Sequence, residues 1–563
     1  MSDPLGLRLQ PDSRRLTLPR FLADVARLHG ERTAISGESS QLSFTQLEAR
    51  ARALARGLVG AGVGKGSRVA LLMANGPEWA VAAFGVSLTG AVLVPINTFA
   101  TPGELDYMLR HSDASLLLMQ KQLGKHAFLD DLASAHPELA RGNPGRLRCP
   151  ALPQLRRVVA WSLAKDGRPP GIDDLEGLLA LGDDVSDELL DAVGEEITPA
   201  DDAVIIYTSG TTAHPKGILH LQRAPVIQSW RFAEDMALSA DDVVFTAQPF
   251  FWTAGMAMSL GASLAAGARL HTLEIFDPER ALDRMEGEKV TTLHAWPHQE
   301  KALAEHPSAA GRDLSRLRKV EFASPMAALA GIEEDVWGTY GSYGMSETFT
   351  LASSLPSWTP AELRAQTSGK PLPGMQLRIV DVESGQPVAP GESGELAVKG
   401  VTFMRGYYKL EPEHFLDAEG FFRTQDGGFM DSAGYLHWKG RLSNLIKTGG
   451  ANVSPLEIEN ALASRADIKT ALAVGVPHPV LGEVIVLCVV PAADTELDAQ
   501  ELRGFLRGQL AVYKVPRRVL FFSAGDLQYT GTQKVQVGPL RDAALARLEA
   551  EGAEIEGHRY AVT

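Results

Sequence analysis

Helical and extended segments alternate along most of this chain, and no other feature limits its fold as strongly. Residues 44–63, FTQLEARARALARGLVGAGV, have the periodicity of an amphipathic helix, and residues 67–75, SRVALLMAN, have the length of a buried strand. Repeated pairs of this kind indicate α/β layers with substantially parallel sheets. At 563 residues, the chain is long enough for one large α/β body with a smaller domain.

The composition excludes several classes of protein. Hydrophobic residues make up 45% of the chain and charged residues 22%, as in folded globular proteins. The net charge of −15 argues against binding to nucleic acid or to an anionic membrane. The two cysteines, Cys149 and Cys488, are too few for a disulfide framework or a zinc site built from cysteines, which fits a reducing cytoplasm. The N-terminal stretch has no continuous apolar run, so a secretory signal is not expected and the predicted location is cytoplasmic.

One uncharged stretch, Trp79–Ile96, approaches the length of a membrane span. Thr89 and Gly90 interrupt it, and a turn there favours two shorter elements. The stretch therefore predicts a helix beginning at Pro77 and a strand ending at Pro95, with no transmembrane segment.

The pattern changes from Gly391 onward. Short strands separated by turns, GESGELAVKG, GYYKL and GFFRTQDGGFMDSAGYLHWKGR, predict a β-rich module that closes the large body. TALAVGVPHP and EVIVLCVVP then predict strands, and LDAQELRGFLRGQL predicts a helix. The expected fold class is α/β: a large N-terminal body of layered, substantially parallel sheets and helices with its β-rich module, residues 1–441, followed by a small α+β C-terminal domain, residues 442–563.

A loop rich in glycine and hydroxyl groups follows the apolar run of residues 203–206. Residues 207–217, YTSGTTAHPKG, offer successive backbone N–H groups, hydroxyls and the ammonium of Lys216, a combination suited to phosphate. The Walker pattern does not fit, because Pro215 precedes Lys216 and Gly217 follows it.

Further motifs follow in a fixed order: YGMSE at 343–347, GKPLPGMQLRIVD from 369, RTQD ending at Asp426, GYLHWKGR ending at Arg441, IKTGGANVSPLEIE from 446, YKVP, and YTGTQK ending at Lys534. The series resembles the adenylate-forming superfamily, which includes acyl-CoA synthetases, adenylation domains and beetle luciferases, and its pattern is closest to acyl-CoA ligases. The resemblance implies that a carboxylate attacks the α-phosphate of ATP, giving an acyl-adenylate and pyrophosphate, and that the acyl group then passes to the thiol of CoA.

The resemblance also implies a role for each matched residue. Tyr343 would flank the adenine, Ser346 would hydrogen-bond the α-phosphate, and Glu347 would help to hold Mg²⁺ on the phosphates. Asp426 would accept the ribose hydroxyls, with Arg441 beside it. The full ATP-binding set is Thr208, Ser209, Gly210, Thr211, Thr212, Lys216, Ser324, Tyr343, Gly344, Met345, Ser346, Asp426, Arg441, Asn452 and Lys534.

The C-terminal domain carries the mobile part of the expected mechanism. Lys534 matches the catalytic lysine of the family, and Lys216 and Glu347 complete the expected catalytic set. The resemblance implies that this domain rotates about a hinge at Ser443 between adenylation and thioester formation. Lys447, Gly449 and Gly450 would lie on the path of CoA.

Several positions depart from the family pattern: Ala213 and Gln425 stand where glycine is usual, Ser443 lacks the usual hinge charge, and Gln528 and Gln533 replace proline and glycine before Lys534. These departures leave open an alternative, a degenerate nucleotide-binding homologue without efficient turnover.

The segment PFFWTAG bears on the acid. Trp252 stands where many relatives carry histidine, and the segment offers no aspartate to hold an amino group, which favours a carboxylic acid without one. Trp296 and His298, with His294 nearby, are expected to line the same acyl pocket. The two tryptophans have an alternative role as core aromatics. His294 and His298 have the spacing of a helical metal pair, but Pro297 lies between them, so Mg²⁺ is the metal expected.

The predicted function is an ATP-dependent acyl-CoA synthetase for a hydrophobic carboxylic acid, medium-chain, aryl or alicyclic, in the broad area of fatty acid metabolism. Its cofactors would be ATP and Mg²⁺, with CoA as co-substrate. A second alternative is an enzyme that loads the thiol of an acyl carrier protein instead of CoA, and a homodimer is the candidate assembly.

Overall fold

The computed structural model describes residues 16–161, 169–208, 215–448, 451–493, 495–510, 512–529 and 535–561. The chain divides into two compact units. Unit 1 comprises Met1–Gln376 and Lys399–Leu416, and unit 2 comprises Leu377–Val398 and Asp417–Thr563. Unit 2 begins at Leu377, well before the domain junction predicted after residue 441. The junction at residue 441 therefore stays a prediction of where the mobile small domain begins.

Unit 1 contains an eight-stranded sheet in the order β18-β9-β8-β4-β3-β5-β6-β7. Its strands are β3 (Arg68–Leu72), β4 (Val92–Pro95), β5 (Leu116–Met119), β6 (Arg157–Ala160), β7 (Ile172–Asp174), β8 (Asp202–Thr208), β9 (Lys216–Leu221) and β18 (Gly406–Tyr407). Neighbouring strands in the part of the sheet from β8 to β7 pair in parallel. Strand β9 pairs antiparallel with both β8 and β18. The buried apolar strands agree with a parallel sheet that is covered on both faces.

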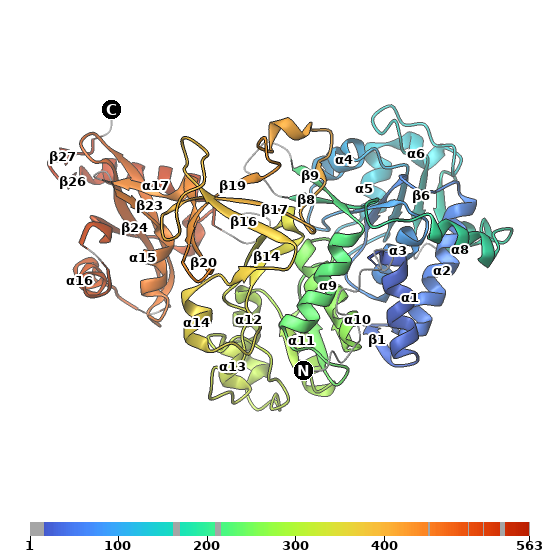
Figure 1. The fold of residues 1–563 in the computed structure, drawn as a ribbon, viewed down its shortest axis with the longest axis horizontal. Helices are drawn as coiled ribbons and strands as arrows, with labels where there is room; N and C mark the ends of the chain where they lie inside the picture. The colour runs from blue at the N-terminus through green and yellow to red at the C-terminus, as the bar shows by residue number, and fades with distance from the viewer. Residues whose placement is uncertain are drawn as a thin grey trace. The chain divides into compact units, whose positions relative to one another are not determined.

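The helices in this part of unit 1 are α1 (Leu18–His29), α2 (Phe44–Gly60), α3 (Pro77–Leu88), α4 (Pro102–His111), α5 (Phe128–Ala135), α6 (Pro137–Arg141), α7 (Leu175–Ala180) and α8 (Asp187–Glu195). Helices α1, α2 and α3 pack side by side (Figure 1). The side chain of Ser43 and that of Gln46 cap the start of α2 reciprocally. Gly85 of α3 allows close packing, because a Cβ there would lie 2.8 Å from the Leu54 side chain.

The uncharged stretch Trp79–Ile96 forms most of α3 and then β4, as predicted. Within the described ranges, no helix is long and apolar enough to cross a membrane. The stretch is apolar all round because α3 is buried in the body of unit 1.

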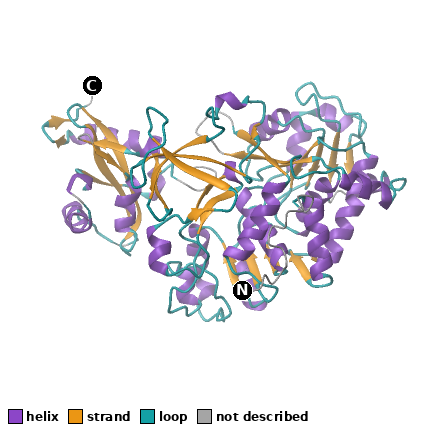
Figure 2. Ribbon diagram, in the orientation of Figure 1, coloured by secondary structure: helices purple, strands orange, loops and turns teal. Residues whose placement is uncertain are grey.

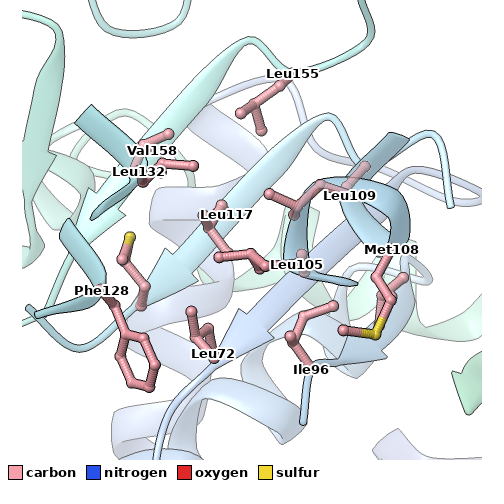
Figure 3. Packing of buried hydrophobic residues seen from close by; sticks show 14 of the residues in the cluster. Leu72, Ile96, Leu105, Met108, Leu109, Leu117, Phe128, Leu132, Leu155 and Val158 are labelled. Carbon is pink, nitrogen blue, oxygen red and sulfur yellow. The ribbon is translucent and has the colours of Figure 1, made fainter. Parts of the chain in front are cut away.

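The core of this half of unit 1 lies between the sheet and helices α4 and α5 (Figure 3). Leu105 and Leu109 of α4 face Leu117 of β5, and Leu132 of α5 lies near Val158 of β6. All five side chains are nearly inaccessible to solvent, and burial of each such side chain contributes about 1.5–3 kcal/mol. The amphipathic faces of α4 and α5 therefore fix these helices on the sheet.

A second sheet of unit 1 has the order β12-β10-β11-β1-β2, with parallel pairing except between β1 and β2. Figure 2 distinguishes the strands, in orange, from the helices, in purple. It comprises β1 (Thr33–Ser36), β2 (Gln41–Ser43), β10 (Val243–Thr246), β11 (Arg269–Thr272) and β12 (Thr292–His294). The helices of this part are α9 (Arg223–Asp235), the π-helix η2 (Gly255–Gly261), α10 (Ala262–Ala266), α11 (Pro278–Gly287), α12 (Pro297–Ala304), α13 (Pro325–Leu329) and α14 (Ala361–Gln366). A small sheet joins β13 (Tyr343–Met345), β14 (Thr350–Ser354) and β15 (Lys370–Pro371).

Unit 2 is built mainly from antiparallel strands. One sheet has the order β16-β17-β19-β20, with β16 (Met375–Val380), β17 (Gly394–Gly400), β19 (Phe422–Met430) and β20 (Leu436–Arg441). The other joins β21 (Ile446–Thr448), β22 (Ala451–Val453), β23 (Ile468–His478), β24 (Gly482–Pro491) and β25 (Arg518–Phe521). Its helices are α15 (Pro455–Leu462), α16 (Ala499–Gln509) and α17 (Val537–Glu551), and a short hairpin pairs β26 (Glu554–Ile555) with β27 (His558–Arg559).

The predicted strands and helix of the C-terminal segment are confirmed as β23, β24 and α16. The β-rich module needs one correction. The stretch GYYKL forms β18, which pairs with β9 and so belongs to the large sheet of unit 1. The strand is only two residues long, and its partner lies far away in the sequence, so local pattern could not assign it to a sheet.

Candidate functional site

The strands β8 and β9 flank the predicted phosphate loop. They pair antiparallel, and their last aligned residues are Thr208 and Lys216. The hydroxyl of Tyr207 lies 2.8 Å from Nδ1 of His111 on α4. A Cβ on Gly217 would lie 3.0 Å from the Ile205 side chain, so glycine suits this close packing. The predicted phosphate contacts Ser209, Gly210, Thr211 and Thr212, and the departure at Ala213, lie outside the described residues.

Three residues far apart in the sequence meet beside this hairpin. The Lys216 ammonium lies over the ring of Tyr407, 4.9 Å from its centre. The Tyr407 hydroxyl donates to Oε1 of Glu347 at 2.7 Å. The backbone also fixes Glu347, since its carbonyl accepts from the amide of Met404 at 2.7 Å. Strand β18 thus connects a cation, an aromatic ring and a carboxylate, which we call the Lys216–Tyr407–Glu347 group.

The YGMSE motif leads directly into a strained turn. It runs through β13 into the 3₁₀-helix η4 (Ser346–Thr348), and the next residues, Phe349 and Thr350, have positive φ angles of 50° and 95°. Gly344 has no room for a side chain, because a Cβ there would lie 1.5 Å from the Thr350 carbonyl oxygen. Such strain persists where the surrounding structure enforces it, and it is frequent at functional sites.

A buried histidine supports this turn from β9. Nε2 of His220 lies 2.8 Å from the Ser346 carbonyl oxygen, and the imidazole packs edge-on against Phe349. Complete burial lowers the pKa of His220 to about 3, so the ring is neutral at physiological pH and Nε2–H donates to the carbonyl. His220 and Tyr407 were not predicted as site residues; the only sequence signal was their position close to recognised motifs.

Ser324 lies at a helix start. Its hydroxyl caps α13 by accepting from the Met326 amide at 3.2 Å. Tyr343 is buried, and Met345 is held through its amide by the Thr348 hydroxyl at 3.1 Å. Nucleotide contacts of these three residues stay predictions.

An aromatic wall lies elsewhere in unit 1, made of Phe99, Phe251, Trp252 and Trp296. Consecutive rings meet edge to face, with centres 5.8, 4.8 and 6.5 Å apart along that order. Trp252 and Trp296 are half-buried and Phe99 is 58% exposed, so the wall is not part of a sealed core. Phe99 and Phe251 were not predicted, and His298 is exposed on α12.

A buried polar network packs below the segment that carries Trp252. The Ser259 hydroxyl, on the π-helix η2, lies within 2.9 Å of the Thr246 hydroxyl, 3.0 Å of Oε1 of Gln248 and 3.3 Å of Nδ1 of His294. Burial, with the Lys319 ammonium nearby, lowers the pKa of His294 to about 4. π-helical turns are rare and often occur at functional sites. His294 ends β12 and His298 lies on α12, so they do not share one helix face as a helical metal pair would.

Two charged residues of unit 2 that were predicted to bind the nucleotide form an ion pair with each other. Asp426 and Arg441 face each other across β19 and β20, and Nε of Arg441 lies 3.2 Å from Oδ1 of Asp426. Arg441 also donates to the Thr424 carbonyl at 2.8 Å, and the Thr424 hydroxyl accepts from the Asp426 amide at 3.1 Å. The Asp426 carboxylate is buried, and two antiparallel strands fix its position before any ligand binds.

Gln425, one of the departures, has a positive φ of 61°. Its amide donates to Oε1 of Glu395 at 2.8 Å, which holds the residue in this left-handed conformation. Glycine adopts that conformation without steric cost, so the structure supplies a physical reason for the usual glycine here.

The remaining predicted residues follow β20. Ser443 lies in the 3₁₀-helix η6 (Leu442–Asn444), and Lys447 and Asn452 occupy aligned positions of β21 and β22. The Lys447 amide donates to Oε2 of Glu483 at 2.8 Å, and its side chain is exposed. Gly449, Gly450, Gln533 and Lys534 lie outside the described residues.

Comparison with known proteins agrees with this architecture. Residues 22–408 match the family model described as AMP-binding enzyme, and residues 457–534 match the AMP-binding enzyme C-terminal domain. The chain therefore belongs to the AMP-binding enzyme family, which confirms the predicted adenylate-forming class.

Similar curated proteins include feruloyl-CoA synthase of an Amycolatopsis species, 32% identical over 531 residues, 92% of this chain and 96% of the relative. Indoleacetate–CoA ligase of Aromatoleum aromaticum is 31% identical over 532 residues, 93% of this chain and 98% of the relative. A 7a-methyl-1,5-dioxo-octahydro-1H-inden-4-yl-propanoyl:CoA ligase of Rhodococcus jostii is 31% identical over 539 residues, 93% and 98% of the two chains.

Solved structures of the same fold include ATP-bound MatB from Rhodopseudomonas palustris, with 26% identity and a TM-score of 0.73 over 93% of this chain and 98% of that one. The anthranilate CoA ligase AuaEII in complex with anthranoyl-AMP has 23% identity and a TM-score of 0.75, over 94% and 98% of the two chains, and shows the fold alone. The predicted α/β fold class with a small C-terminal domain is confirmed.

Proposed function

We propose that this protein is an ATP-dependent acyl-CoA synthetase that activates a ring-bearing hydrophobic carboxylic acid, aryl or alicyclic. The observation that carries the choice of acid is the aromatic wall of Phe99, Phe251, Trp252 and Trp296, in which Phe251 is buried and the other three rings are partly or largely exposed. Aromatic side chains pack favourably against flat rings at centre distances of about 4.5–7 Å. Relatives named for feruloyl, indoleacetate and bicyclic propanoyl substrates support the same choice.

In unit 1, the Lys216–Tyr407–Glu347 group would hold the phosphates of ATP. Lys216 and the Thr208 hydroxyl would bind the departing β- and γ-phosphates from the two ends of the loop, and Ser346 would hydrogen-bond the α-phosphate. Positive charge placed before the reaction stabilises the charge that develops as pyrophosphate leaves.

The chemistry around Glu347 fits magnesium. Mg²⁺ prefers oxygen donors and is commonly held by one or two carboxylates together with substrate phosphates. Glu347 supplies such a carboxylate, and its hydrogen bond from Tyr407 fixes its orientation. When bound, the ion would neutralise charge on the phosphates.

In unit 2, the Asp426 carboxylate would accept the ribose hydroxyls while Arg441 holds its orientation. Lys534 would approach the α-phosphate and the attacking carboxylate during adenylation. Rotation about Ser443 would then bring Lys447, Gly449 and Gly450 to the pantetheine arm of CoA. These assignments rest on the motif resemblance together with the local geometry of β19 and β20.

Pyrophosphate release by the purified protein tests the proposal. The assay contains ATP, Mg²⁺ and a panel of medium-chain, aryl and alicyclic acids, each with and without CoA. We expect the largest CoA-dependent release with ring-bearing acids, and a thioester detected by mass. Bound adenylate that CoA does not discharge would instead indicate a carrier-protein thiol as acceptor. No release across the panel would favour the nucleotide-binding homologue without turnover.

The aromatic wall is tested by Trp252→Ala. Loss of this ring should lower kcat/KM for ring-bearing acids about tenfold relative to a straight-chain acid, because each well-packed aromatic contact contributes about 0.5–1.5 kcal/mol beyond its buried area. Trp358→Ala is the matched control, since Trp358 is 53% exposed in unit 1 and is not part of the wall. If Trp252→Ala has the same preference among carboxylic acids as the wild type, Trp252 serves only in packing.

A further inference from the structure

A second cluster of chemically reactive side chains, which shares no residue with the Lys216–Tyr407–Glu347 group, lies where α5 and α6 meet α4. His136, at the junction of α5 and α6, Glu138 of α6, and Cys149 in the following loop each present one donor atom, and these atoms all lie within 4.8 Å of one another. Asp106 of α4 contacts the same imidazole. We call these four residues the His136 cluster.

The imidazole of His136 is oriented for ligation. Nε2 lies 2.7 Å from Oδ1 of Asp106, so it carries the proton that this carboxylate accepts. Nδ1 then presents its lone pair toward Cys149, 3.6 Å from Sγ. A carboxylate on the distal nitrogen of a metal-binding histidine is the usual supporting contact, since it fixes the tautomer and raises the basicity of the ring.

The spacing between two of the donors, Sγ of Cys149 and Nδ1 of His136, also fits a tetrahedral ion. With zinc–sulfur and zinc–nitrogen bonds of about 2.3 and 2.0–2.1 Å, tetrahedral geometry places the two donors about 3.5 Å apart. The observed separation of Sγ and Nδ1 is 3.6 Å. The Cys149 thiol donates to Oε1 of Glu138 at 3.1 Å, so a proton now occupies the position between two donors that an ion would take.

From this geometry we infer that His136, Glu138 and Cys149 form a zinc site, with Asp106 supporting His136. A thiolate, an imidazole and a carboxylate together suit Zn²⁺ better than Mg²⁺ or Ca²⁺, which prefer oxygen donors. Metal binding displaces the thiol proton to solvent, and a water molecule supplies the fourth ligand. The half-exposed Glu138 gives the ion access, while His136 and Cys149 are buried.

The same residues also resemble a nucleophilic cysteine with a histidine base, but the surroundings oppose that role. Cys149 is 2% exposed, so an electrophile has little access to the sulfur. A catalytic thiolate needs positive surroundings, whereas here a carboxylate faces the sulfur. A divalent cation between the two groups removes that repulsion.

Zinc binding would stabilise α4 and strand β8, which precedes the predicted phosphate loop. Zinc would fasten residues 136–149 to α4 through Asp106. The next residue of α4, Tyr107, packs edge-on against Tyr207, and His111 of the same helix contacts the Tyr207 hydroxyl. Tyr207 directly precedes Thr208, the last residue of β8, so the ion would stiffen the C-terminal end of that strand.

Cobalt substitution in the full-length protein, without an affinity tag, tests the site. After chelator treatment and reduction, Co²⁺ should give a thiolate-to-cobalt charge-transfer band in the near ultraviolet and the visible bands of four-coordinate cobalt. An equimolar amount of Zn²⁺ should abolish both, and Zn²⁺ should raise the thermal midpoint of the metal-free protein. Absence of the charge-transfer band in the wild type would overturn the proposal.

The two cysteines provide a matched pair of variants. Cys149→Ser should lose the charge-transfer band, whereas Cys488→Ser should keep it, because Cys488 is buried in β24 outside the cluster. Asp106→Asn keeps every ligand and should weaken zinc binding by about 10–100-fold. An equal band in Cys149→Ser, or unchanged zinc affinity in Asp106→Asn, would contradict the assigned geometry.

Discussion

The two units hold their charged groups in different ways. In unit 1, Lys216 is an exposed side chain at a strand end, lying over the ring of Tyr407 beside a loop. In unit 2, Asp426 and Arg441 are already paired across two antiparallel strands, and the carboxylate is buried. One unit offers a cation on a flexible stem, and the other offers an oriented acceptor.

This difference corresponds to the proposed tasks. Phosphates move apart as pyrophosphate leaves, and a lysine on a flexible stem can follow them. The ribose keeps its geometry throughout the reaction, so a fixed carboxylate suits it and loses little freedom on binding. The units therefore differ in where rigidity helps: at the ribose it orients the nucleotide, and at the phosphates it would hinder the reaction.

The largest expected effect tests whether unit 2 takes part in the reaction as well as orienting the nucleotide. Lys534→Ala should lower the adenylation rate by about 10²–10³-fold, because it removes a cation from developing negative charge, while ATP binding changes little. Single-turnover formation of acyl-adenylate measures the rate, and equilibrium dialysis measures binding. Lys469→Ala, at an exposed position of β23, is the control. Full adenylation by Lys534→Ala would show that the cation is another residue.

A second prediction concerns His294, a buried histidine of unit 1. His294 has an ordinary pKa of 6.5 when unfolded and about 4 when folded, so the unfolded chain binds more protons between these values. The free energy of unfolding should therefore fall as the pH is lowered from 6.5 toward 4, by about 2 kcal/mol from this residue between pH 7 and pH 5. His294→Gln should flatten that dependence in urea titrations, and exposed His414→Gln should not. Parallel curves for wild type and His294→Gln would remove this residue from the explanation.

A smaller effect sharpens the role of the Lys216–Tyr407–Glu347 group. Tyr407→Phe removes the hydrogen bond to Glu347 and should lower kcat/KM for ATP with Mg²⁺ about tenfold, because a hydrogen bond to a charged group contributes about 1.5 kcal/mol or more. Tyr408→Phe is closely matched, since its hydroxyl donates to Asp113 at 2.9 Å instead. Equal kinetic losses in both variants would mean that the two hydroxyls act only through stability.

The smallest effect lies in unit 2. Gln425→Gly should raise the free energy of unfolding by about 0.5–1 kcal/mol, because relief of the left-handed conformation outweighs the added freedom of glycine in the unfolded chain. Gln376→Gly, in the extended strand β16, should instead lower it. Urea titrations measure both, and destabilisation by Gln425→Gly would indicate that the side chain makes an essential contact.

Local sequence pattern predicted much of the fold. Apolar runs gave the buried strands, and Pro77 with the Thr89–Gly90 break placed α3 and β4 correctly. It failed for β18, where two residues pair with a strand nearly two hundred positions earlier in the chain. Pairing across such a separation depends on the closed sheet and leaves no periodic signal in the strand itself.

The candidate site divides in the same way. Motif order predicted Lys216, Tyr343, Glu347, Asp426 and Arg441 as site residues, because the proposed chemistry requires these residue types. His220, Tyr407 and Phe99 were not identified, since each supports the site through a contact made only in the folded chain. The His136 cluster was missed because a count of cysteines does not detect a mixed set of donors.

The sequence by itself therefore determined the α/β layers, the family and the groups predicted to bind ATP, since hydrophobic periodicity and motif chemistry are written in local order. The tertiary structure alone decided which supporting side chains meet: Tyr407 at Glu347, the aromatic wall around Trp252, and His136 between Asp106 and Cys149. These contacts join residues from separate strands, helices and loops. Only packing of the whole unit brings such residues within bonding distance.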